Sequence, residues 1–404
     1  MSDNLFKGIE NKSKIFKNRD IIGPHYIPEK ILFRKKQIDE LVDSLGVTIK
    51  GKKADNVFIY GKTGTGKTST AKYVLNQLAE YKKESKSAVM DVYLNCRNYN
   101  SKYKVIGHIV KKFYQDNDYL GYSSTFIYEK MTEFLENNST QLIVVLDEVD
   151  KIKDLDELIY SLIRTNDELK KAGISIIGIS NKLTFKERLD PRSKSSLCEK
   201  ELLFPPYNAN ELKAILEQRV KEAFFENVVD GSAINLAAAI AAQESGDART
   251  AVMLLLRAGE LAEKEKSDKV TDVEVKKAKS KVEEEIMYDM ISTLPEQQQL
   301  VLYSIARLTY EKKGVRRIGS NSEENILLSG EVYDCYSSIA KKVKENVVSS
   351  RWYREYINEL EMYGLITTTA SGKGIRGNTQ VIKLGFEAEK IKNLIEKNLL
   401  RKEG

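Results

Sequence analysis

The sequence predicts an α/β domain with a parallel sheet, then a small helical domain, then a domain of three helices and a β-hairpin. Three observations lead to this prediction. Short β-branched runs alternate with helical patterns as far as Pro205-Pro206, and from Asn208 the pattern is purely helical. Near the end, a helix stopped by Gly364 leads into two β-prone runs joined by a glycine-rich, basic tip. A chain of 404 residues is long enough for two or three such domains.

Composition narrows the class of protein. Hydrophobic residues make up 41% and charged residues 31%, as in soluble globular proteins. The net charge of +6 permits an anionic partner without demanding one. Three cysteines without a CxxC motif and two distant histidines predict reduced thiols and no metal cluster of these residues. No signal peptide or membrane-spanning run is present, so we expect a cytoplasmic protein without membrane contact.

The first domain is predicted to cover residues 1–206 and to include an N-terminal arm. "RKKQIDELVDSLGVTI" (34–49) predicts one helix before the sheet. Nearly continuous apolar runs are typical of parallel strands that are covered on both faces. The five predicted strands are "NVFIY" (56–60), "VMDVYLN" (89–95), "LIVVLDEV" (142–149), "SIIGIS" (175–180) and "ELLF" (201–204).

Capping patterns organise the second and third domains, predicted at 207–288 and 289–404. Asn208 is followed by Glu211, and Thr271 by Glu274, as at helix starts. The helical pattern breaks at Gly246 and restarts with Asp247 as N-cap, and Thr293 is predicted to cap the first helix of the third domain. Three helices followed by a two-stranded wing are the order of a winged helix.

The first motif is a phosphate loop. "GKTGTGKT" (61–68) lies between a predicted strand and a predicted helix, which is the context such a loop requires. Its glycines let backbone N–H groups turn toward phosphate oxygens, and the helix N-terminus adds positive charge. Lys67 is predicted to reach the β- and γ-phosphates of the bound nucleotide, ATP or ADP being the expected cofactor, and Thr68 to ligate Mg²⁺. The predicted nucleotide-binding residues here are Gly61, Lys62, Thr63, Gly64, Thr65, Gly66, Lys67, Thr68 and Ser69.

Acidic residues follow the third predicted strand. "LIVVLDEVD" (142–150) buries an apolar run and delivers Asp147 at its carboxyl end, where ligands gather in open α/β sheets. Asp147 is predicted to be a Mg²⁺ ligand. Glu148 is placed to orient and polarise the attacking water, and Asp150 is expected to cap a helix.

Two later segments offer further catalytic candidates. "SIIGISN" ends with Asn181, whose neutral amide suits the positioning of water beside the γ-phosphate. "RLDPRSKSSL" (188–197) carries Arg188, Arg192 and Lys194 on a proline-containing segment. An arginine there would stabilise transition-state charge on the nucleotide of a neighbouring molecule. The alternative is that these are ordinary surface cations.

The ordered motifs resemble a known family. "GKTGTGKT", "VVLDEVD", "GISN", "LDPRSKSSL", "FPPYNANEL" and "SGDARTA" follow one another along the chain. This set is similar to the archaeal origin-recognition and initiator ATPases, AAA+ proteins related to the eukaryotic origin-recognition and cell-division-control initiators. The resemblance extends from "FKNRDIIGPHYIPEKILFR" (16–34) nearly to the end. It implies an AAA+ core, a helical lid and a C-terminal winged helix.

The resemblance also implies roles for individual residues. Arg249 corresponds to the lid arginine that senses the γ-phosphate, and Arg192 to the finger that acts in trans, which implies self-association. A helical domain hinged at Pro205-Pro206 could close on nucleotide through Arg249. The other implied nucleotide contacts are Tyr207 and Arg219 in the lid, and Tyr26, Ile27 and Arg34 beside the adenine.

The winged helix suggests a partner. In this fold the third helix enters the major groove and the wing touches DNA nearby. The third helix, "SSRWYREYINELEMYG" (349–364), is expected to bury Ile357, Leu360 and Met362. The wing is "TTTASGKGIRGNTQVIKLG" (367–385). The predicted DNA-binding residues are Ser350, Arg351, Tyr353, Arg354, Lys373, Arg376 and Asn378. Against this, Glu355, Glu359 and Glu361 would repel phosphates if they faced DNA.

The predicted function is that of an origin-binding replication initiator. It binds double-stranded origin DNA, and ATP or ADP sets the lid angle and thereby the recruitment or loading of a replicative helicase. Its ATP hydrolysis is expected to be slow, because a switch needs persistent states. Two other classes stay open: a regulatory ATPase whose winged helix binds protein, and a clamp-loader-like remodelling ATPase in a ring.

Overall fold

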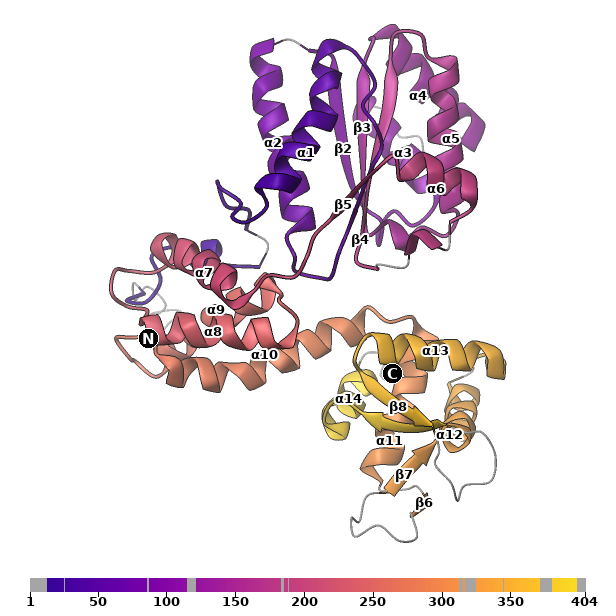
Figure 1. Ribbon diagram of the computed structural model, residues 1–404. Coiled ribbons are helices and arrows are strands. Elements are labelled where there is room, and N and C mark those ends of the chain that lie inside the picture. Colours follow the sequence, from indigo (N-terminus) through magenta and orange to yellow (C-terminus); the bar gives the residue numbers. More distant parts are fainter. Residues whose placement is uncertain are drawn as a thin grey trace, which may run out of the picture. The chain divides into compact units, whose positions relative to one another are not determined.

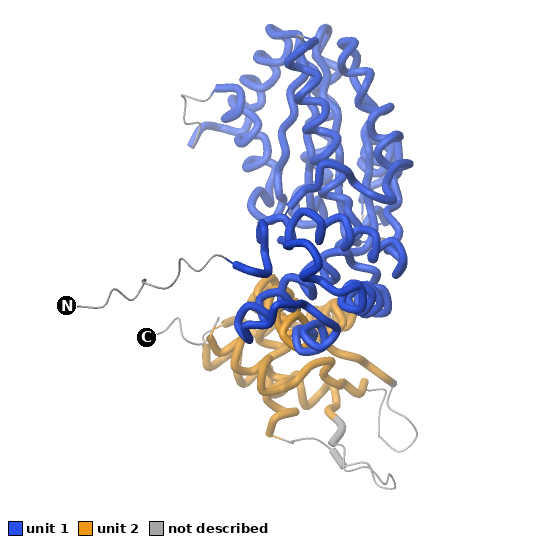
Figure 2. Tube along the Cα trace, turned by 90° about the vertical axis from the view of Figure 1, so that its left-hand side faces the viewer, with its two compact units in different colours: residues 1–279 blue, residues 280–404 orange. Residues whose placement is uncertain are grey.

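The computed structural model describes residues 13–24, 26–85, 87–114, 121–182, 185–187, 189–311, 315–316, 325–343, 345–370 and 380–397. The chain divides into two compact units, residues 1–279 and 280–404, which Figure 2 colours separately. Unit 1 contains the sheet that was predicted and the helical lid. Unit 2 contains the winged helix.

A five-stranded parallel sheet forms the centre of unit 1 (Figure 1). Its strands are β1 (Val57–Tyr60), β2 (Val89–Asn95), β3 (Gln141–Asp147), β4 (Gly173–Ser180) and β5 (Lys200–Leu203). Their order is β2-β3-β4-β1-β5, and all neighbouring pairs are parallel. Every residue of β3 and β4 is buried, which explains their continuous apolar runs. The predicted α/β fold class is confirmed.

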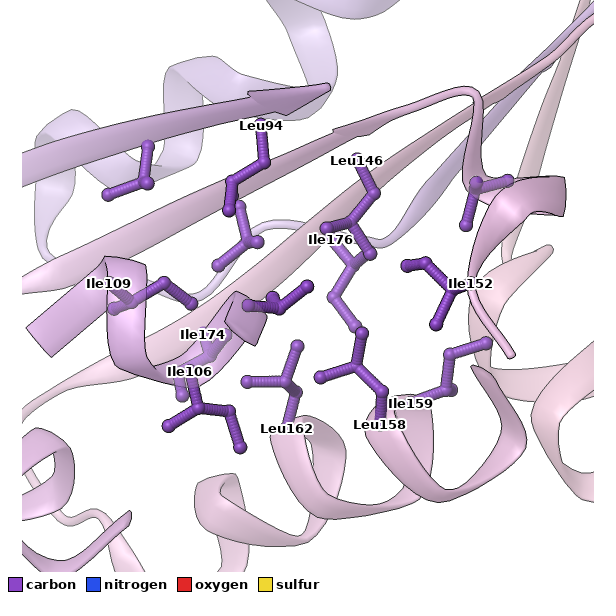
Figure 3. Packing of buried hydrophobic residues seen from close by; sticks show 14 of the residues in the cluster. Leu94, Ile106, Ile109, Leu146, Ile152, Leu158, Ile159, Leu162, Ile174 and Ile176 are labelled. Carbon is purple, nitrogen blue, oxygen red and sulfur yellow. The ribbon is translucent and has the colours of Figure 1, made fainter. Parts of the chain in front are cut away.

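Helices cover both faces of the sheet (Figure 1). They are α1 (Lys35–Gly46), α2 (Lys67–Ser85), α3 (Lys102–Phe113), α4 (Ser124–Asn137), α5 (Leu155–Glu168) and α6 (Pro191–Leu197). On one face, Leu146 of β3 and Ile176 of β4 point toward Leu158 of α5, as Figure 3 shows. On the other face, α1 and α2 contribute Leu41 and Val74 to a second apolar cluster. These two clusters pack the helices against the two faces of the sheet.

The lid follows the sheet in unit 1. Its helices are α7 (Ala209–Ala223), α8 (Gly231–Glu244), α9 (Ala248–Lys264) and the first part of α10 (Asp272–Ser292). The predicted capping box of α7 forms, because Asn208 and Glu211 bond reciprocally. At α10 half of the predicted box forms: Thr271 N donates to Glu274 Oε2 at 2.8 Å, whereas the Thr271 hydroxyl accepts from Val273 N. Helix α10 runs without a break past residue 288, where the pattern of helices and caps had placed the end of the second domain.

The N-terminal arm (residues 13–34) packs on the lid through its first part. Phe16 lies against Phe224 at a ring-centroid distance of 4.8 Å, and its ring occupies the space that a Cβ on Gly259 of α9 would need. The backbone N–H groups of Lys17 and Asn18 both donate to Ala223 O. The arm therefore lies with the lid helices, although it was predicted as part of the α/β domain.

Unit 2 has the helices and the hairpin that were predicted. They are α11 (Glu296–Tyr310), α12 (Ser329–Lys342), α13 (Ser350–Met362), β8 (Ile366–Ala370) and β9 (Gln380–Leu384). The elements that were not predicted are β6 (Val315–Arg316), β7 (Asn325–Leu328) and α14 (Ala388–Ile395). The antiparallel sheet has the order β6-β7-β9-β8. The predicted cap of α11 is wrong: Pro295 occupies the N-cap, and the Thr293 hydroxyl donates backward to Met290 O.

None of the helices in the described ranges is both long and apolar enough to cross a membrane.

Candidate functional site

The phosphate loop connects β1 to α2. Gly64 and Gly66 have φ values of +68° and +86°, in the left-handed region that favours glycine. Lys67 begins α2 and is only 4% exposed, and its Nζ donates to Gly61 O at 2.8 Å and to Lys62 O at 2.7 Å. Burial lowers the pKa of Lys67 to about 8. A buried ammonium held by two carbonyls of a glycine loop fits a phosphate-binding role.

The two predicted metal ligands lie beside the loop. The Thr68 hydroxyl of α2 donates to Asp147 Oδ2 at 2.7 Å, and Asp147 ends β3. A hydroxyl and a carboxylate oxygen are donors that Mg²⁺ accepts, so these residues fit the predicted ion. The Tyr93 hydroxyl of β2 donates to the same carboxylate oxygen and was not predicted. Only the pairing of β2 with β3 brings Tyr93 there, and short-range sequence patterns do not specify that pairing.

The predicted catalytic carboxylate has an unexpected partner. Glu148 adopts the left-handed region with φ of +56°, which is a strained conformation for a residue with a side chain. Its Oε2 accepts a hydrogen bond and ion pair from Arg97 Nε, in the loop that follows β2. The side chain that would polarise water is therefore engaged by a cation in this state.

The neighbouring strand end contains Asn181. It directly follows β4 and is exposed, at the same edge of the sheet as Asp147 because β3 and β4 are parallel neighbours. Asp150 accepts a hydrogen bond from Ser180 Oγ at 3.0 Å and lies 3.9 Å from Lys182 Nζ. The prediction that Asp150 caps a helix is wrong, because its carboxylate joins the end of β4 to the segment after β3.

The lid contacts the phosphate loop directly. Ala248 N, at the start of α9, donates to Gly64 O at 3.1 Å. A Cβ on Gly64 would lie 1.4 Å from Asp247 Oδ1, so only glycine allows this approach. Asp247 caps α9 by accepting from Arg249 N, as predicted. The exposed Arg249 lies close enough for its charge to contribute to the lowered pKa of Lys67.

Arg34 joins the arm to the loop and the hinge. It is 2% exposed, and its Nε donates to Thr65 O at 2.9 Å. Its two terminal nitrogens donate to Pro205 O at 2.7 Å and to Phe33 O at 3.0 Å. The guanidinium also lies 3.8 Å from the ring centroid of Tyr207. The predicted nucleotide residues Arg34 and Tyr207 thus come together behind the loop, where Arg34 binds backbone carbonyls.

Arg219 and Tyr26 form a second predicted pair. Arg219 of α7 donates to Ile21 O at 3.0 Å and to Tyr26 O at 2.8 Å, and its guanidinium lies 4.6 Å from the Tyr26 ring centroid. These bonds hold the arm on the lid. Ile27 follows and is half-buried.

Arg192 lies on the surface. It is exposed near the start of α6, and among the described residues no contact ties its side chain to the phosphate loop. Asp190 caps this helix by accepting from Arg192 N at 2.8 Å. The cap fixes the backbone of Arg192 and leaves its guanidinium in solvent. Arg188 lies outside the described residues.

Helix α13 presents three of the predicted DNA-binding side chains to solvent. Ser350, Arg351 and Arg354 are exposed. Tyr353 is a correction: it is 3% exposed, and its hydroxyl donates to Ser329 O at 2.9 Å. Its ring packs against Tyr333. Residue 353 lies one turn before the buried Ile357, so both side chains point to the same side of the helix. Tyr353 therefore belongs to the core of the domain.

The other end of α13 also differs from expectation. Met362 was placed on the buried side but is 55% exposed. Glu361 accepts hydrogen bonds from the backbone N–H and the hydroxyl of Thr368 in β8. Glu359 accepts from Gln298 Nε2 of α11. Of the three glutamates that argued against DNA, two are therefore used inside the domain. The predicted wing residues Lys373, Arg376 and Asn378 lie outside the described residues.

Comparison with known proteins identifies the family. The description "AAA domain" matches residues 50–184, "Cdc6 AAA+ ATPase-type lid domain" matches 213–280, and "CDC6, C terminal winged helix domain" matches 289–394. An ORC1-type DNA replication protein of Thermococcus kodakarensis is 40% identical over 396 residues, covering 96% of this chain and 93% of that protein. The chain belongs to the ORC1/Cdc6 family. The predicted resemblance is thereby confirmed.

Further ORC1/Cdc6 relatives agree along the chain. ORC1-type DNA replication protein 1 of Archaeoglobus fulgidus is 39% identical over 396 residues, covering 98% of this chain and 94% of the relative. The solved structure of the Aeropyrum pernix ORC1 protein in complex with DNA has a TM-score of 0.80 and 33% identity. It covers 96% of this chain and 99% of that one. Membership of this AAA+ ATPase family supports nucleotide binding and ATPase activity.

The pKa of Lys67 predicts a pH dependence for this ORC1/Cdc6 protein. Bound phosphates favour the protonated ammonium, whose pKa is about 8 without ligand. We expect ATP affinity to be flat below pH 8 and to fall by roughly tenfold per pH unit above it. Titration with a fluorescent ATP analogue at increasing pH measures this. Calorimetry in two buffers should find proton uptake near pH 8 and none from Lys67 well below it. Constant affinity up to pH 9.5 would contradict the assignment of Lys67.

Proposed function

We propose that this chain is an ATP-controlled initiator of DNA replication that binds duplex origin DNA in the cytoplasm. In the same proposal it helps to recruit or load a replicative helicase. The similarity to ORC1-type DNA replication proteins over nearly the whole chain supports the first part. That the similar Aeropyrum pernix ORC1 structure contains DNA supports DNA as the ligand.

One observation carries the proposed nucleotide control: the lid helix α9 begins on the phosphate loop. Ala248 N bonds to Gly64 O, and the Asp247 carboxylate lies against the same glycine. A nucleotide that enters the loop must therefore meet the first turn of α9, which also carries Arg249. The γ-phosphate distinguishes ATP from ADP at this point, so the two nucleotides would favour different lid positions.

The predicted magnesium ligands and catalytic residues each have a role in the proposed reaction. Thr68 and Asp147 would hold Mg²⁺, which supplies positive charge to the phosphates. Glu148 would accept a proton from the attacking water, and Asn181 would orient that water. Arg192 of a second copy would stabilise the developing charge. The engagement of Glu148 by Arg97 supports slow turnover, because the base must be released before it can act.

The proposed DNA contact lies on α13. Arg351 and Arg354 are exposed, and among the described residues neither forms an ion pair. They would bind phosphate or guanine. Glu359 and Glu361 keep their negative charge, because their partners Gln298 and Thr368 are neutral, but these bonds hold both carboxylates toward the rest of the domain. The same observations weigh against a winged helix that binds only protein.

Anisotropy of a fluorescein-labelled duplex tests the proposal. The full chain should bind duplex at low salt, with affinities that differ between ATP and ADP. A helicase-loading role should appear as nucleotide-dependent retention of a purified replicative helicase on origin DNA. Absence of duplex binding at low salt would favour the protein-binding alternative. Equal duplex affinities with ATP and with ADP would contradict the proposed nucleotide control.

Removing one phosphate contact should change the salt dependence. Replacing Arg354 by alanine is expected to weaken binding to all duplexes and to lower the slope of log K against log salt by about 0.9. Lys397→Ala, an exposed lysine just beyond α14, loses the same charge and is the matched control. A loss confined to particular sequences would instead make Arg354 a base-reading residue.

A further inference from the structure

Helix α13 has a core-facing side and an outward side. Tyr353, Ile357 and Leu360 face the core, at the i, i+4, i+7 spacing of one helix face. The exposed side chains of its N-terminal half are Ser350, Arg351, Trp352, Arg354 and Glu355. Trp352 and Glu355 carry no positive charge to bind phosphate. The DNA contacts proposed above do not include either of them.

Trp352 is the only tryptophan of the chain and is 59% exposed. No other large hydrophobic side chain in the described ranges is as exposed. Burial of a large apolar side chain is favourable. The adjacent Tyr353 is buried in the domain, whereas Trp352 is left in solvent. Its neighbour Arg351 carries a positive charge, so this apolar surface lies within a cationic one. Aromatic and arginine side chains are also enriched at protein interfaces, so this combination alone does not select the occupant. Base edges in a DNA groove are the occupant argued here, because the same helix carries the proposed phosphate contacts Arg351 and Arg354.

Glu355 lies one turn after Trp352 on the same side of the helix. It is exposed, and among the described contacts it has no partner, although Arg351 lies four residues before it. In contrast, Glu359 and Glu361 of the same helix are bonded within the domain. A free carboxylate here costs affinity for any polyanion, and a hydrogen-bond donor on the ligand would offset that cost.

We propose that Trp352 and Glu355 read adjacent base pairs in the major groove. Trp352 contacts a thymine methyl group, and Glu355 accepts a hydrogen bond from N4 of cytosine. Residues three apart lie on the same side of a helix with Cβ atoms about 5–6 Å apart, so both side chains can reach the same stretch of groove. Arg351 and Arg354 then supply affinity, and Glu355 supplies discrimination, because bases without a suitable donor leave its carboxylate unpaired. This inference rests on the proposed DNA binding and specifies how it becomes sequence-selective.

Selection from duplexes with a randomised central segment tests the reading of bases. The full-length wild type should enrich a cytosine beside a thymine. Glu355→Ala should lose about tenfold or more of the preference for that cytosine while binding unrelated duplex at least as tightly. Trp352→Ala should lose the thymine preference. Glu389→Ala on α14 and Met362→Ala at the other end of α13 are exposed controls that should keep both preferences. Identical enrichment by wild type and both variants would overturn the proposal.

Emission from Trp352 gives an independent measurement, since no other tryptophan contributes. When the enriched duplex binds, emission should shift and acrylamide quenching should decrease, because the indole leaves water. Unchanged emission while labelled duplex binds would overturn the inference and leave the proposed function intact. A shift that depends on protein concentration without DNA would assign Trp352 to self-association instead. If no duplex binds at low salt, the proposed function itself fails.

Discussion

Replacing Lys67 by alanine is expected to abolish nucleotide binding, with a loss of about a hundredfold or more in ATP affinity. Charge-assisted hydrogen bonds contribute about 1.5–3 kcal/mol each, and this ammonium would make one to the β-phosphate and one to the γ-phosphate, which together correspond to about a hundredfold or more. Lys67 lies at the start of α2, inside the glycine loop. Among the described residues it is the only lysine that is buried. Equilibrium titration with a fluorescent ATP analogue measures the loss.

Folding must be checked in that variant, because Gly61 O and Lys62 O also lose their partner. Thermal unfolding should show that the protein is folded at the assay temperature. Lys83→Ala removes an exposed lysine from the far end of the same helix and should bind ATP like wild type. ATP affinity of Lys67→Ala within a few-fold of wild type would rule out the proposed phosphate contact.

Replacing Glu148 by glutamine is expected to keep nucleotide binding and to slow hydrolysis by about a hundredfold or more. General-base catalysis contributes about 10²–10⁴-fold, and glutamine preserves shape without accepting a proton. Phosphate release under saturating ATP measures turnover, and the titration used for Lys67 measures binding. If the variant hydrolyses ATP as fast as wild type, Glu148 is not the base.

Arg97 provides the contrasting substitution at the same carboxylate. Its guanidinium pairs with Glu148 in the loop after β2. Arg97→Ala should free the carboxylate and raise turnover, whereas Glu148→Gln lowers it. If the double variant hydrolyses ATP as slowly as Glu148→Gln alone, Arg97 acts on turnover only through Glu148, as the ion pair implies.

The five strands and the caps of the lid helices could be predicted, because their signals are local. An uninterrupted apolar run such as 142–146 predicts a buried strand, and Asn208 with Glu211 predicts a helix start. The phosphate loop was equally visible. In α13 the spacing of 353, 357 and 360 contained the signal that Tyr353 is buried and Met362 is exposed. The prediction assigned Tyr353 to DNA and Met362 to the core by chemical type and did not take account of their positions around the helix.

Other site features could not be predicted, because they depend on contacts between distant segments. Tyr93 meets Asp147 through strand pairing, and Asp247 meets Gly64 through the position of the lid. Arg97 reaches Glu148 from a loop with no motif of its own. Short-range patterns specify each segment separately, while these contacts arise only after the segments have packed.

Arg34 has a consequence for how this protein tolerates change. Its guanidinium donates to three main-chain oxygens, those of Phe33, Thr65 and Pro205, so these bonds do not depend on the side chains of its partners. A change of side chain at any of those three positions can therefore leave its hydrogen bond to Arg34 intact. The arginine has no such latitude, since a lysine lacks the planar fork that reaches all three at once. In a library of variants, position 34 should therefore be far less permissive than position 33, whose exposed side chain takes no part in these bonds.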